Sequence, residues 1–292
     1  MQHFMFAKME GAGNDFVIVD NRLHPVPEFA KVKLVRDLCR RAQGIGADGM
    51  VFLENDPDYD FAWDFYNADG SRAEMCGNAS RCVARFAHIF GLVDEREMVF
   101  RTAAGPIRAE LTAAGARVRL PDVAPAKLFK GVSAGPAGPA FDAYLVNTGV
   151  PHAVVPVQDL GKIDVANWGR ALRRHECFGP AGANVDFMAR SSQYGLAIRT
   201  YERGVEGETL ACGTGATAAA LIGADVYKLK TPISVETRGG PILTISFDAD
   251  PDGGAGEIWL EGPATLVFVG KTFWPNEGRE NDFLELMMEL ED

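Results

Sequence analysis

The chain has 292 residues, of which 47% are hydrophobic and 24% charged, and these values exclude a disordered, collagen-like or mucin-like protein. Its formal net charge is −11 without a basic block, and no apolar run approaches the roughly 18 residues of a membrane span, which argues against nucleic-acid and membrane partners. The N-terminus lacks the plan of a signal peptide and the five cysteines are too few for a disulfide scaffold, so we expect a cytoplasmic protein with reduced thiols.

Short strands with a few helices between them are the predicted elements. Runs rich in Val, Ile and aromatic residues predict strands at 16–20, 50–54, 60–66, 115–120, 195–201 and 265–270. Apolar periodicity predicts helices at 31–42, 78–91, 159–176 and 213–229. The segment 121–140, with four Pro and three Gly, reads as a linker or long loop between two domains. Together these elements indicate an α+β or β-rich α/β fold.

The two halves of the sequence resemble each other at three places. The aligned pairs are Asp15 with His152, Asp48 with Asp186, and Cys76 with Cys212, and the partners are separated by nearly the same length of chain in each pair. Three matches in one order at nearly one separation indicate a duplicated unit, with coincidence among small residues as the alternative. We therefore expect two copies of one domain that each bring one Cys-Gly pair to a shared cleft.

Each Cys-Gly pair stands between a strand-like and a helix-like segment. The two turns are Cys76-Gly77-Asn78 and Cys212-Gly213-Thr214. The glycines let the backbone approach a ligand closely, and Asn78 and Thr214 are suitable N-caps. Free N–H groups at a helix N-terminus favour a carboxylate or a thiolate and lower the pKa of a cysteine. The turns thus predict an activated thiol and a carboxylate cradle, and the alternative is that each Cys is a small buried hydrophobe.

Metal and cofactor signals are weak. Cys39, Cys82 and Cys177 have no partner in the other half and are expected to be structural, and no Cys-x-x-Cys or His pair has the spacing of metal ligands. The segment 44–49 matches G-x-G-x-x-G, but a helix precedes it and a strand follows, the reverse of a dinucleotide site. It predicts a helix-to-strand turn instead. With no recognisable pyridoxal-phosphate lysine, we expect no cofactor.

Two opposed thiols are suited to inverting a carbon atom next to a carboxylate. One group removes the weakly acidic hydrogen in a water-poor pocket, and a second returns a proton to the opposite face. A thiolate and a thiol can exchange these roles with the direction of the reaction.

Polar residues gather close to the two turns. They are Asn14, Asn67, Asn184, Glu202 and Arg203. Amides can bind both an amine and a carboxylate, and an Arg can hold a carboxylate with two hydrogen bonds, although each Asn alone also fits simple turn chemistry. Glu202 and His152 could tune the thiol pKa values through their charge, with a structural histidine as the alternative for His152.

These blocks resemble the diaminopimelate epimerase family along nearly the whole chain. The matching segments are KMEGAGNDFV (8–17), GIGADG (44–49), FYNADGSRAEMCGNASRC (65–82), GVPH (149–152), NVDF (184–187), YERGVEGETLACGTGA (201–216) and a late strand ending near Trp274. The resemblance implies a cofactor-independent, commonly homodimeric enzyme that interconverts LL- and meso-2,6-diaminopimelate in lysine and peptidoglycan-precursor synthesis.

The resemblance also implies a fold and residue roles. The family fold is two pseudo-symmetric domains, each a sheet rolled around a central helix, which we place at 1–121 plus 264–292 and at 122–263. The catalytic pair falls on Cys76 and Cys212, and the residues thought to adjust the thiols fall on His152 and Glu202. The substrate contacts fall on Asn14, Asn67, Gly77, Asn78, Asn184, Glu202, Arg203, Gly213 and Thr214.

The chain departs from the family pattern in three respects. Val150 stands where many members carry an Asn that contacts the substrate, and Ala79 stands where Gly is frequent. The tail 275–292 holds seven acidic residues and one Arg. Four of its apolar residues, Phe283, Leu286, Met287 and Leu290, fall on one helical face, which suits either docking on the body or a partner, or a frayed terminus.

Three other functions stay open. One is a proline or hydroxyproline racemase of the same architecture, one a non-catalytic amino-acid-binding protein, and one a thiol redox protein. The Asn67 block and the pair Glu202-Arg203 favour diaminopimelate.

Overall fold

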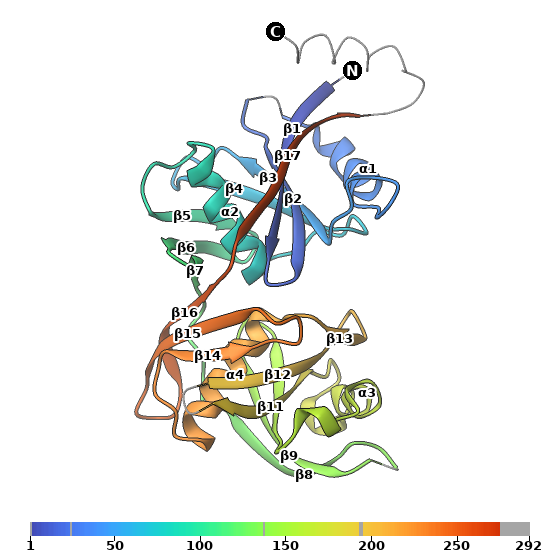
Figure 1. Ribbon diagram of the computed structural model, residues 1–292, viewed down its shortest axis with the longest axis vertical. Helices are drawn as coiled ribbons and strands as arrows, with labels where there is room; N and C mark the ends of the chain where they lie inside the picture. Colours follow the sequence, from blue (N-terminus) through green and yellow to red (C-terminus); the bar gives the residue numbers. More distant parts are fainter. Residues whose placement is uncertain (1, 24, 137, 193–194, 275–292) are drawn as a thin grey trace.

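The computed structural model describes residues 2–23, 25–136, 138–192 and 195–274 (Figure 1). The helices are α1 (Glu28–Leu38), α2 (Gly77–Ile89), α3 (Arg170–Arg173) and α4 (Gly213–Val226), with short 3-10 or π turns at Leu160–Lys162, Val165–Gly169 and Glu176–Phe178. The strands of the first half are β1 (Gln2–Gly11), β2 (Asn14–Asp20), β3 (Gly49–Glu54), β4 (Phe61–Asn67), β5 (Glu97–Thr102), β6 (Gly105–Thr112) and β7 (Gly115–Arg119). The remaining strands are β8 (Lys127–Ser133), β9 (Ala140–Asn147), β10 (Pro151–Pro156), β11 (Asn184–Ser192), β12 (Gly195–Glu202), β13 (Gly207–Thr209), β14 (Ile233–Glu236), β15 (Ile242–Ala249), β16 (Ala255–Gly262) and β17 (Thr265–Trp274).

The molecule has two lobes, each with strands wrapped around one helix (Figure 1). Helix α2 packs against β1, β2, β6 and β7 in the first lobe, and α4 packs against β10, β11, β12, β14 and β15 in the second. This arrangement confirms the predicted β-rich α+β fold. Strand β17 returns to the first lobe and pairs antiparallel with β1. The residue boundaries that we assign to the two domains stay a prediction.

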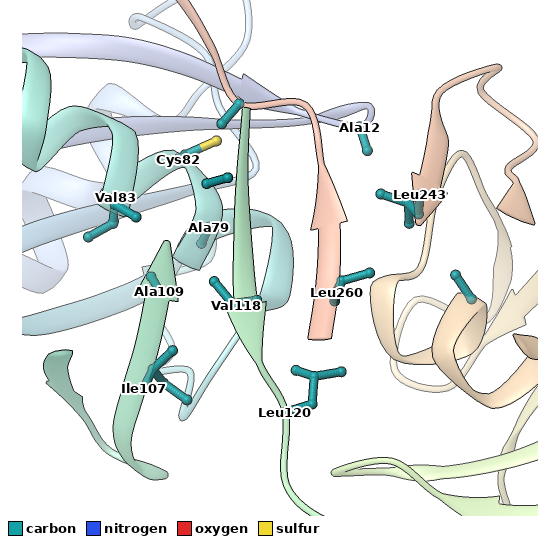
Figure 2. Packing of buried hydrophobic residues seen from close by; sticks show 14 of the residues in the cluster. Ala12, Ala79, Cys82, Val83, Ile107, Ala109, Val118, Leu120, Leu243 and Leu260 are labelled. Atoms are coloured by element: carbon teal, nitrogen blue, oxygen red, sulfur yellow. The ribbon is translucent and has the colours of Figure 1, made fainter. Parts of the chain in front are cut away.

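Both central helices are buried because their side chains are small or apolar on most faces. Helix α4 reads GTGATAAALIGADV, and its Gly223 packs so closely on β12 that an added Cβ would lie 2.6 Å from a Leu196 methyl. Figure 2 shows Ala79 and Val83 of α2 beside Ala109 of β6 and Val118 of β7. The close packing fixes the start of each helix relative to the strands around it.

One strand is shared by both lobes. Strand β16 pairs antiparallel with β7 of the first lobe and with β15 of the second. Leu260, near the C-terminal end of this strand, lies opposite Val118 on one side and Ile245 on the other, and it is completely buried. This strand therefore runs beneath the junction at which the two lobes meet.

The strand ladders support the duplication but correct two of the three aligned pairs. Phe16 pairs with Gly49 across the parallel strands β2 and β3, as His152 pairs with Asn184 across β10 and β11. Phe16 is thus the structural counterpart of His152, and these two residues are separated along the chain by the same length as Cys76 and Cys212.

The alignment of Asp15 with His152 was therefore wrong by one position, and that of Asp48 with Asp186 by three. Met50 faces Tyr66 as Val185 faces Tyr201, which makes Val185 the counterpart of Met50. Short blocks of small residues match in several registers, whereas backbone hydrogen bonds allow one.

Several other sequence expectations are resolved by the structure. The helices predicted at 31–42, 78–91 and 213–229 are confirmed as α1, α2 and α4 with shifted ends, and 44–49 is a turn from helix to strand as predicted. The helix predicted at 159–176 was wrong, because short turns and the four-residue α3 take its place. The loop predicted at 121–140 contains β8, which pairs with β9 through an irregular register around Gly131. The tail 275–292 lies outside the described residues.

Candidate active site

The N-termini of the two central helices converge on one side chain. A Cβ added to Gly77, the first residue of α2, would lie 2.9 Å from Leu260 Cδ2, and a Cβ added to Gly213, the first residue of α4, would lie 2.8 Å from the same atom. A Cβ at either position would force this leucine methyl to shift, and glycine avoids that contact. Cys76 and Cys212 immediately precede these glycines, so the chain brings its two Cys-Gly turns together at Leu260 of β16.

The cysteines themselves occupy the N-cap positions. Cys76 (φ −145°, ψ 121°) and Cys212 (φ −129°, ψ 112°) are extended, and helical geometry starts at the following glycine. The prediction that Asn78 and Thr214 are the N-caps was therefore wrong; each is the second residue of its helix. The first N–H groups of a helix have no acceptor within the helix, so both thiols stand where donors are available.

The Cys76 thiol lies between opposing influences. Burial, the largest, raises its pKa, and the charge of Glu202 raises it further. The backbone N–H groups of Ala79 and Asn78 and the guanidinium of Arg81 act to lower the pKa. A thiolate at this position therefore has donors and a cation beside it.

The Cys212 thiol has a different environment. Burial raises its pKa well above the ordinary value, and the carboxylates of Glu202 and Asp186 raise it further. Its Sγ lies 3.4 Å from Thr214 Oγ1, which lies 2.9 Å from His152 Nε2. The surroundings of Cys212 therefore favour the protonated thiol.

His152 is completely buried and held from both sides. Its Nδ1 lies 2.6 Å from Oδ2 of Asp186, which is also completely buried and accepts a second hydrogen bond from the Thr200 hydroxyl at 2.7 Å. In the neutral imidazole Nδ1 carries the hydrogen towards this carboxylate and Nε2 accepts from the Thr214 hydroxyl, whereas in the protonated imidazole both nitrogens donate. Asn184 Nδ2 also approaches Nε2, at 3.3 Å.

Asn184 links this histidine to the end of β12. Its Oδ1 accepts a hydrogen bond from the backbone N–H of Arg203 at 2.7 Å. No ion pair of the Arg203 guanidinium occurs among the described residues, which leaves this cation available for a ligand carboxylate.

A chain of side-chain amides lies on the first-lobe side. Asn14 Nδ2 donates to Asp48 at 3.0 Å, and Asn78 Nδ2 donates to Asn14 Oδ1 at 2.6 Å. Arg81 Nη2 in turn donates to Asn78 Oδ1 at 2.8 Å. Because each amide has a partner on both sides, the orientations of Asn14 and Asn78 are fixed.

Glu202 connects the two thiols electrostatically. Its charge raises the pKa of both Cys76 and Cys212. Burial raises the pKa of Glu202 itself, Asp186 raises it further and His152 lowers it. The carboxyl of Glu202 therefore lies in the same water-poor region as both sulfurs.

Most of the predicted residues come together here, and one has only local contacts. Contacts or charges join Cys76, Gly77, Asn78, Asn14, His152, Asn184, Glu202, Cys212, Gly213 and Thr214 at the two helix N-termini. Asn67 is exposed, and its amide donates to Ser71 Oγ at 3.0 Å within its own turn. Val150 occupies the position equivalent to Asn14, two positions before His152 as Asn14 precedes Phe16.

Three residues of the site were missed by sequence reasoning as functional elements. Asp186 orients His152, Arg81 stands behind Cys76, and Leu260 separates the two helix starts. Asp186 did leave a signal, since it is a charged residue between Val185 and Phe187 of a strand, whereas Arg81 shares its helix with Arg85 and left none. Leu260 left none.

The other cysteines lie apart from this arrangement. Burial raises the pKa of Cys39 and of Cys82 to about 12, so both stay neutral thiols at neutral pH. Cys177 lies near His175, with Sγ 3.1 Å from Nδ1. In the described ranges no group of three or more His, Cys, Asp or Glu side chains is arranged to hold a metal ion, and none of the helices there is long and apolar enough to cross a membrane.

The fold is shared with several solved structures. A phenazine biosynthesis protein of the PhzF family from Bacillus anthracis superposes with a TM-score of 0.71 at 14% sequence identity, covering 94% of this chain and 100% of that one. A probable proline racemase from Agrobacterium radiobacter superposes with a TM-score of 0.67 at 16% identity, covering 94% of each chain. The chain thus has the two-lobed fold of these proteins.

Sequence relatives define the family more narrowly. The model of the family described as "Diaminopimelate epimerase" matches residues 6–125 and 144–267. The diaminopimelate epimerase of Aquifex aeolicus is 44% identical over 276 residues, which cover 91% of this chain and 96% of the relative. That of Hydrogenobaculum sp. is 41% identical over 280 residues, covering 91% and 97%. The chain belongs to the diaminopimelate epimerase family.

Proposed function

We propose that this protein interconverts LL-2,6-diaminopimelate and meso-2,6-diaminopimelate with Cys76 and Cys212 as the two acid–base groups. The observation that carries the proposal is the convergence of the two cysteine-capped helices on Leu260, with one carboxylate, Glu202, acting on both thiols. Relatives that are 40–44% identical over about nine-tenths of the chain and named for this activity support the choice of substrate.

The reaction begins with one thiolate and one thiol on opposite faces of the substrate α-carbon. The thiolate takes the α-proton, so an S–H bond forms as the C–H bond breaks and its electron pair stays on carbon. The opposing thiol then delivers its proton to the other face and becomes the thiolate. Atoms and charge balance without another reactant, and the enzyme is left with the protonation states of its cysteines exchanged.

The substrate α-carboxylate is bound by the helix starts in this proposal. Free N–H groups after Gly77 and after Gly213 provide dipoles on which the negative charge that develops during proton removal can spread. The guanidinium of Arg203, which forms no ion pair with any residue that the structure describes, supplies a cation for a carboxylate. The side chains of Asn14, Asn67, Asn78 and Asn184 supply amides for the rest of the substrate.

His152 and Glu202 act on the thiols instead of touching the α-hydrogen. The path from Cys212 Sγ through Thr214 Oγ1 to His152 Nε2 supports a role for His152 in setting the protonation of Cys212. The charge of Glu202 discourages simultaneous ionisation of the two sulfurs, because it raises the pKa of each.

The test is incubation of the purified protein with LL-diaminopimelate in heavy water. We expect meso product to form and deuterium to enter the inverted α-carbon. Proline and hydroxyproline serve as comparison substrates because a probable proline racemase and a hydroxyproline epimerase share this fold. Turnover of proline alone would refute the proposal, and binding of diaminopimelate without any deuterium incorporation would identify a non-catalytic binding protein.

A homodimer in the cytoplasm completes the proposal. The exposed apolar side chains of Met5 on β1 and of Val267, Phe268 and Val269 on β17 support an interface between two copies. The chemistry requires reduced thiols, which supports a reducing compartment. Light scattering should give twice the chain mass of 31.5 kDa, and a mass equal to one chain at micromolar concentration would exclude the dimer.

A further inference from the structure

Arg81 is a completely buried cation whose hydrogen-bond partners are all neutral. Its Nη2 donates to Asn78 Oδ1 at 2.8 Å, its Nη1 to the Gly77 carbonyl at 3.3 Å and its Nε to the Pro263 carbonyl at 3.3 Å. No ion pair of Arg81 with a carboxylate occurs in the described part of the chain. A buried charge without a counter-charge is strongly unfavourable, so a negative group should be present nearby in the working protein.

Three titratable groups face Arg81. They are Cys76 at the start of α2, Cys82 on the next turn of the helix and Glu10 on β1. Burial raises the pKa of Cys82 to about 12, so Cys82 stays neutral at neutral pH. Glu10 is partly exposed, and one of its oxygens accepts the backbone N–H of Gly13. Cys76 is the remaining group that can become an anion inside the site.

The matching position in the second lobe carries no charge. Thr217 is the counterpart of Arg81, because each is the fifth residue of its helix, counted from Gly213 and from Gly77. The Thr217 hydroxyl donates to the carbonyl of Gly213 as the Arg81 guanidinium donates to that of Gly77, and both side chains are completely buried. The duplicated scaffold therefore places a cation behind one thiol and a neutral hydroxyl behind the other.

The carboxylates near Cys212 raise the pKa of its thiol, whereas Arg81 acts to lower the pKa of Cys76. The carboxylate of Glu202 raises the pKa of both thiols, whereas that of Asp186 is an additional negative charge that acts on Cys212. Thr214 Oγ1 lies 3.4 Å from Cys212 Sγ and 2.9 Å from His152 Nε2, so the hydroxyl joins this thiol to the imidazole, and its hydrogen bond lowers the pKa of Cys212 by less than burial raises it. Geometry and charge together favour a proton on Cys212.

From this asymmetry we infer that Arg81 is the counter-ion that holds Cys76 as the thiolate in the resting protein, while Cys212 holds the proton. The inference rests on the proposed two-thiol reaction and adds its starting state. Arg81 is a positioning residue because it acts through Cys76. In the first turnover Cys76 removes the substrate proton and Cys212 supplies one to the opposite face.

Alkylation with iodoacetamide at a series of pH values tests the inference, with the modified cysteines identified by mass spectrometry. Only the thiolate reacts, so the pH at half-maximal rate reports the ionisation of each thiol independently of its accessibility. In the wild-type protein we expect Cys76 to show a lower midpoint than Cys212. This comparison needs no variant and does not depend on turnover.

Variants of Arg81 then test the cause. Arg81→Met should raise the midpoint of Cys76 by about 1–3 pH units, which slows its alkylation about 10- to 1000-fold at pH values below the midpoint. Arg81→Lys keeps the charge and should retain most of the wild-type midpoint. Arg85→Met is the matched control, since it removes a partly exposed Arg one turn further along α2 and should leave Cys76 unchanged. Thermal unfolding identifies any variant that is not folded.

A lower midpoint for Cys212 than for Cys76 in the wild-type protein would overturn the inference even if no Arg81 variant folds. An unchanged Cys76 midpoint in folded Arg81→Met would also overturn it. Both outcomes are distinguishable from a failure of the proposed function, in which the wild-type protein leaves LL-diaminopimelate unchanged in heavy water whichever thiol is ionised.

Discussion

His152 Nδ1 lies 2.6 Å from Asp186 Oδ2, and neither side chain is exposed to solvent. Because β10 and β11 are parallel and adjacent, the histidine and the aspartate come from neighbouring strands whose register is fixed by backbone hydrogen bonds. The aspartate in turn fixes which nitrogen of the imidazole faces Thr214. The protonation of Cys212 thus depends on Asp186, which is connected to this thiol through His152 and Thr214.

Enlarging Gly215 should disrupt this pair. A Cβ at position 215 would lie 2.4 Å from Asp186 Oδ1, the oxygen that also accepts from Thr200. We expect Gly215→Ala to lower the free energy of unfolding by about 1–3 kcal/mol and to reduce kcat, because the carboxylate must move away from its partners. Gly207→Ala is the control, since no atom lies within 4 Å of its added Cβ. Equal stability and activity of the two variants would contradict this account.

Removing either thiol of the pair should abolish inversion. Cys76→Ala and Cys212→Ala are each expected to lower the rate of epimerisation by at least about 10²–10⁴-fold, because one face of the α-carbon then has no proton donor or acceptor. Cys82→Ala is the control with a cysteine from the same helix. It should cost about 1 kcal/mol of stability for the small cavity beside Gly11 and keep its activity. Epimerisation by either Cys76→Ala or Cys212→Ala at a wild-type rate would end the two-thiol mechanism.

The free energy of unfolding of a Glu202→Gln variant should increase relative to that of the wild type as the pH rises. Burial raises the pKa of Glu202 in the folded state, so its stabilising contribution is full below the ordinary value of 4.5 and is lost as the pH rises through the folded pKa. The difference should reach about 1.4 kcal/mol for each pH unit that separates the folded and unfolded pKa values.

Urea unfolding between pH 4 and pH 8 measures this difference. Glu95→Gln, an exposed position, is the control and should follow the wild type at every pH. A constant difference between Glu202→Gln and the wild type over the whole range would show that the carboxyl of Glu202 ionises alike in both states.

Shortening Leu260 should loosen the surface that both helix starts share. Leu260→Ala is expected to lower the free energy of unfolding by about 2–5 kcal/mol and also to lower kcat, because both cysteine turns rest on this side chain. Leu196→Ala is the matched control. Leu196 is equally buried but packs against Gly223, near the other end of α4, so it should lose stability without a comparable loss of kcat. Equal effects on kcat would show that Leu260 acts only through stability.

The sequence allowed a good part of the site to be predicted, because its signals are local. The two Cys-Gly turns can be recognised in the sequence because a strand, a turn of small residues and a helix follow one another directly around Cys76-Gly77 and around Cys212-Gly213. The same reasoning failed where position depends on distant segments. Arg81 could not be assigned a role without knowing that Pro263 and Asn78 surround it with neutral partners, and Asp186 could not be matched to His152 without the register of β10 and β11.

The duplication itself illustrates this limit. Cys76 and Cys212 align correctly in sequence because both open a helix, whereas Asp15 and His152 differ by one ladder position. The corrected register pairs His152 with Phe16, and the alignment of Cys76 with Cys212 pairs Thr217 with Arg81. Each lobe therefore keeps the scaffold of the common unit but carries its own chemistry.

The route of β16 and β17 also limits how the molecule can be divided. Both strands follow the second lobe in the chain, yet they pair with β7 and β1 of the first. A fragment ending near residue 121 would expose the edges of β1 and β7 as two unsatisfied rows of amide and carbonyl groups, which invite aggregation. Each copy of the repeated unit therefore depends on strands from the other part of the chain, and we expect neither half to fold when it is expressed alone.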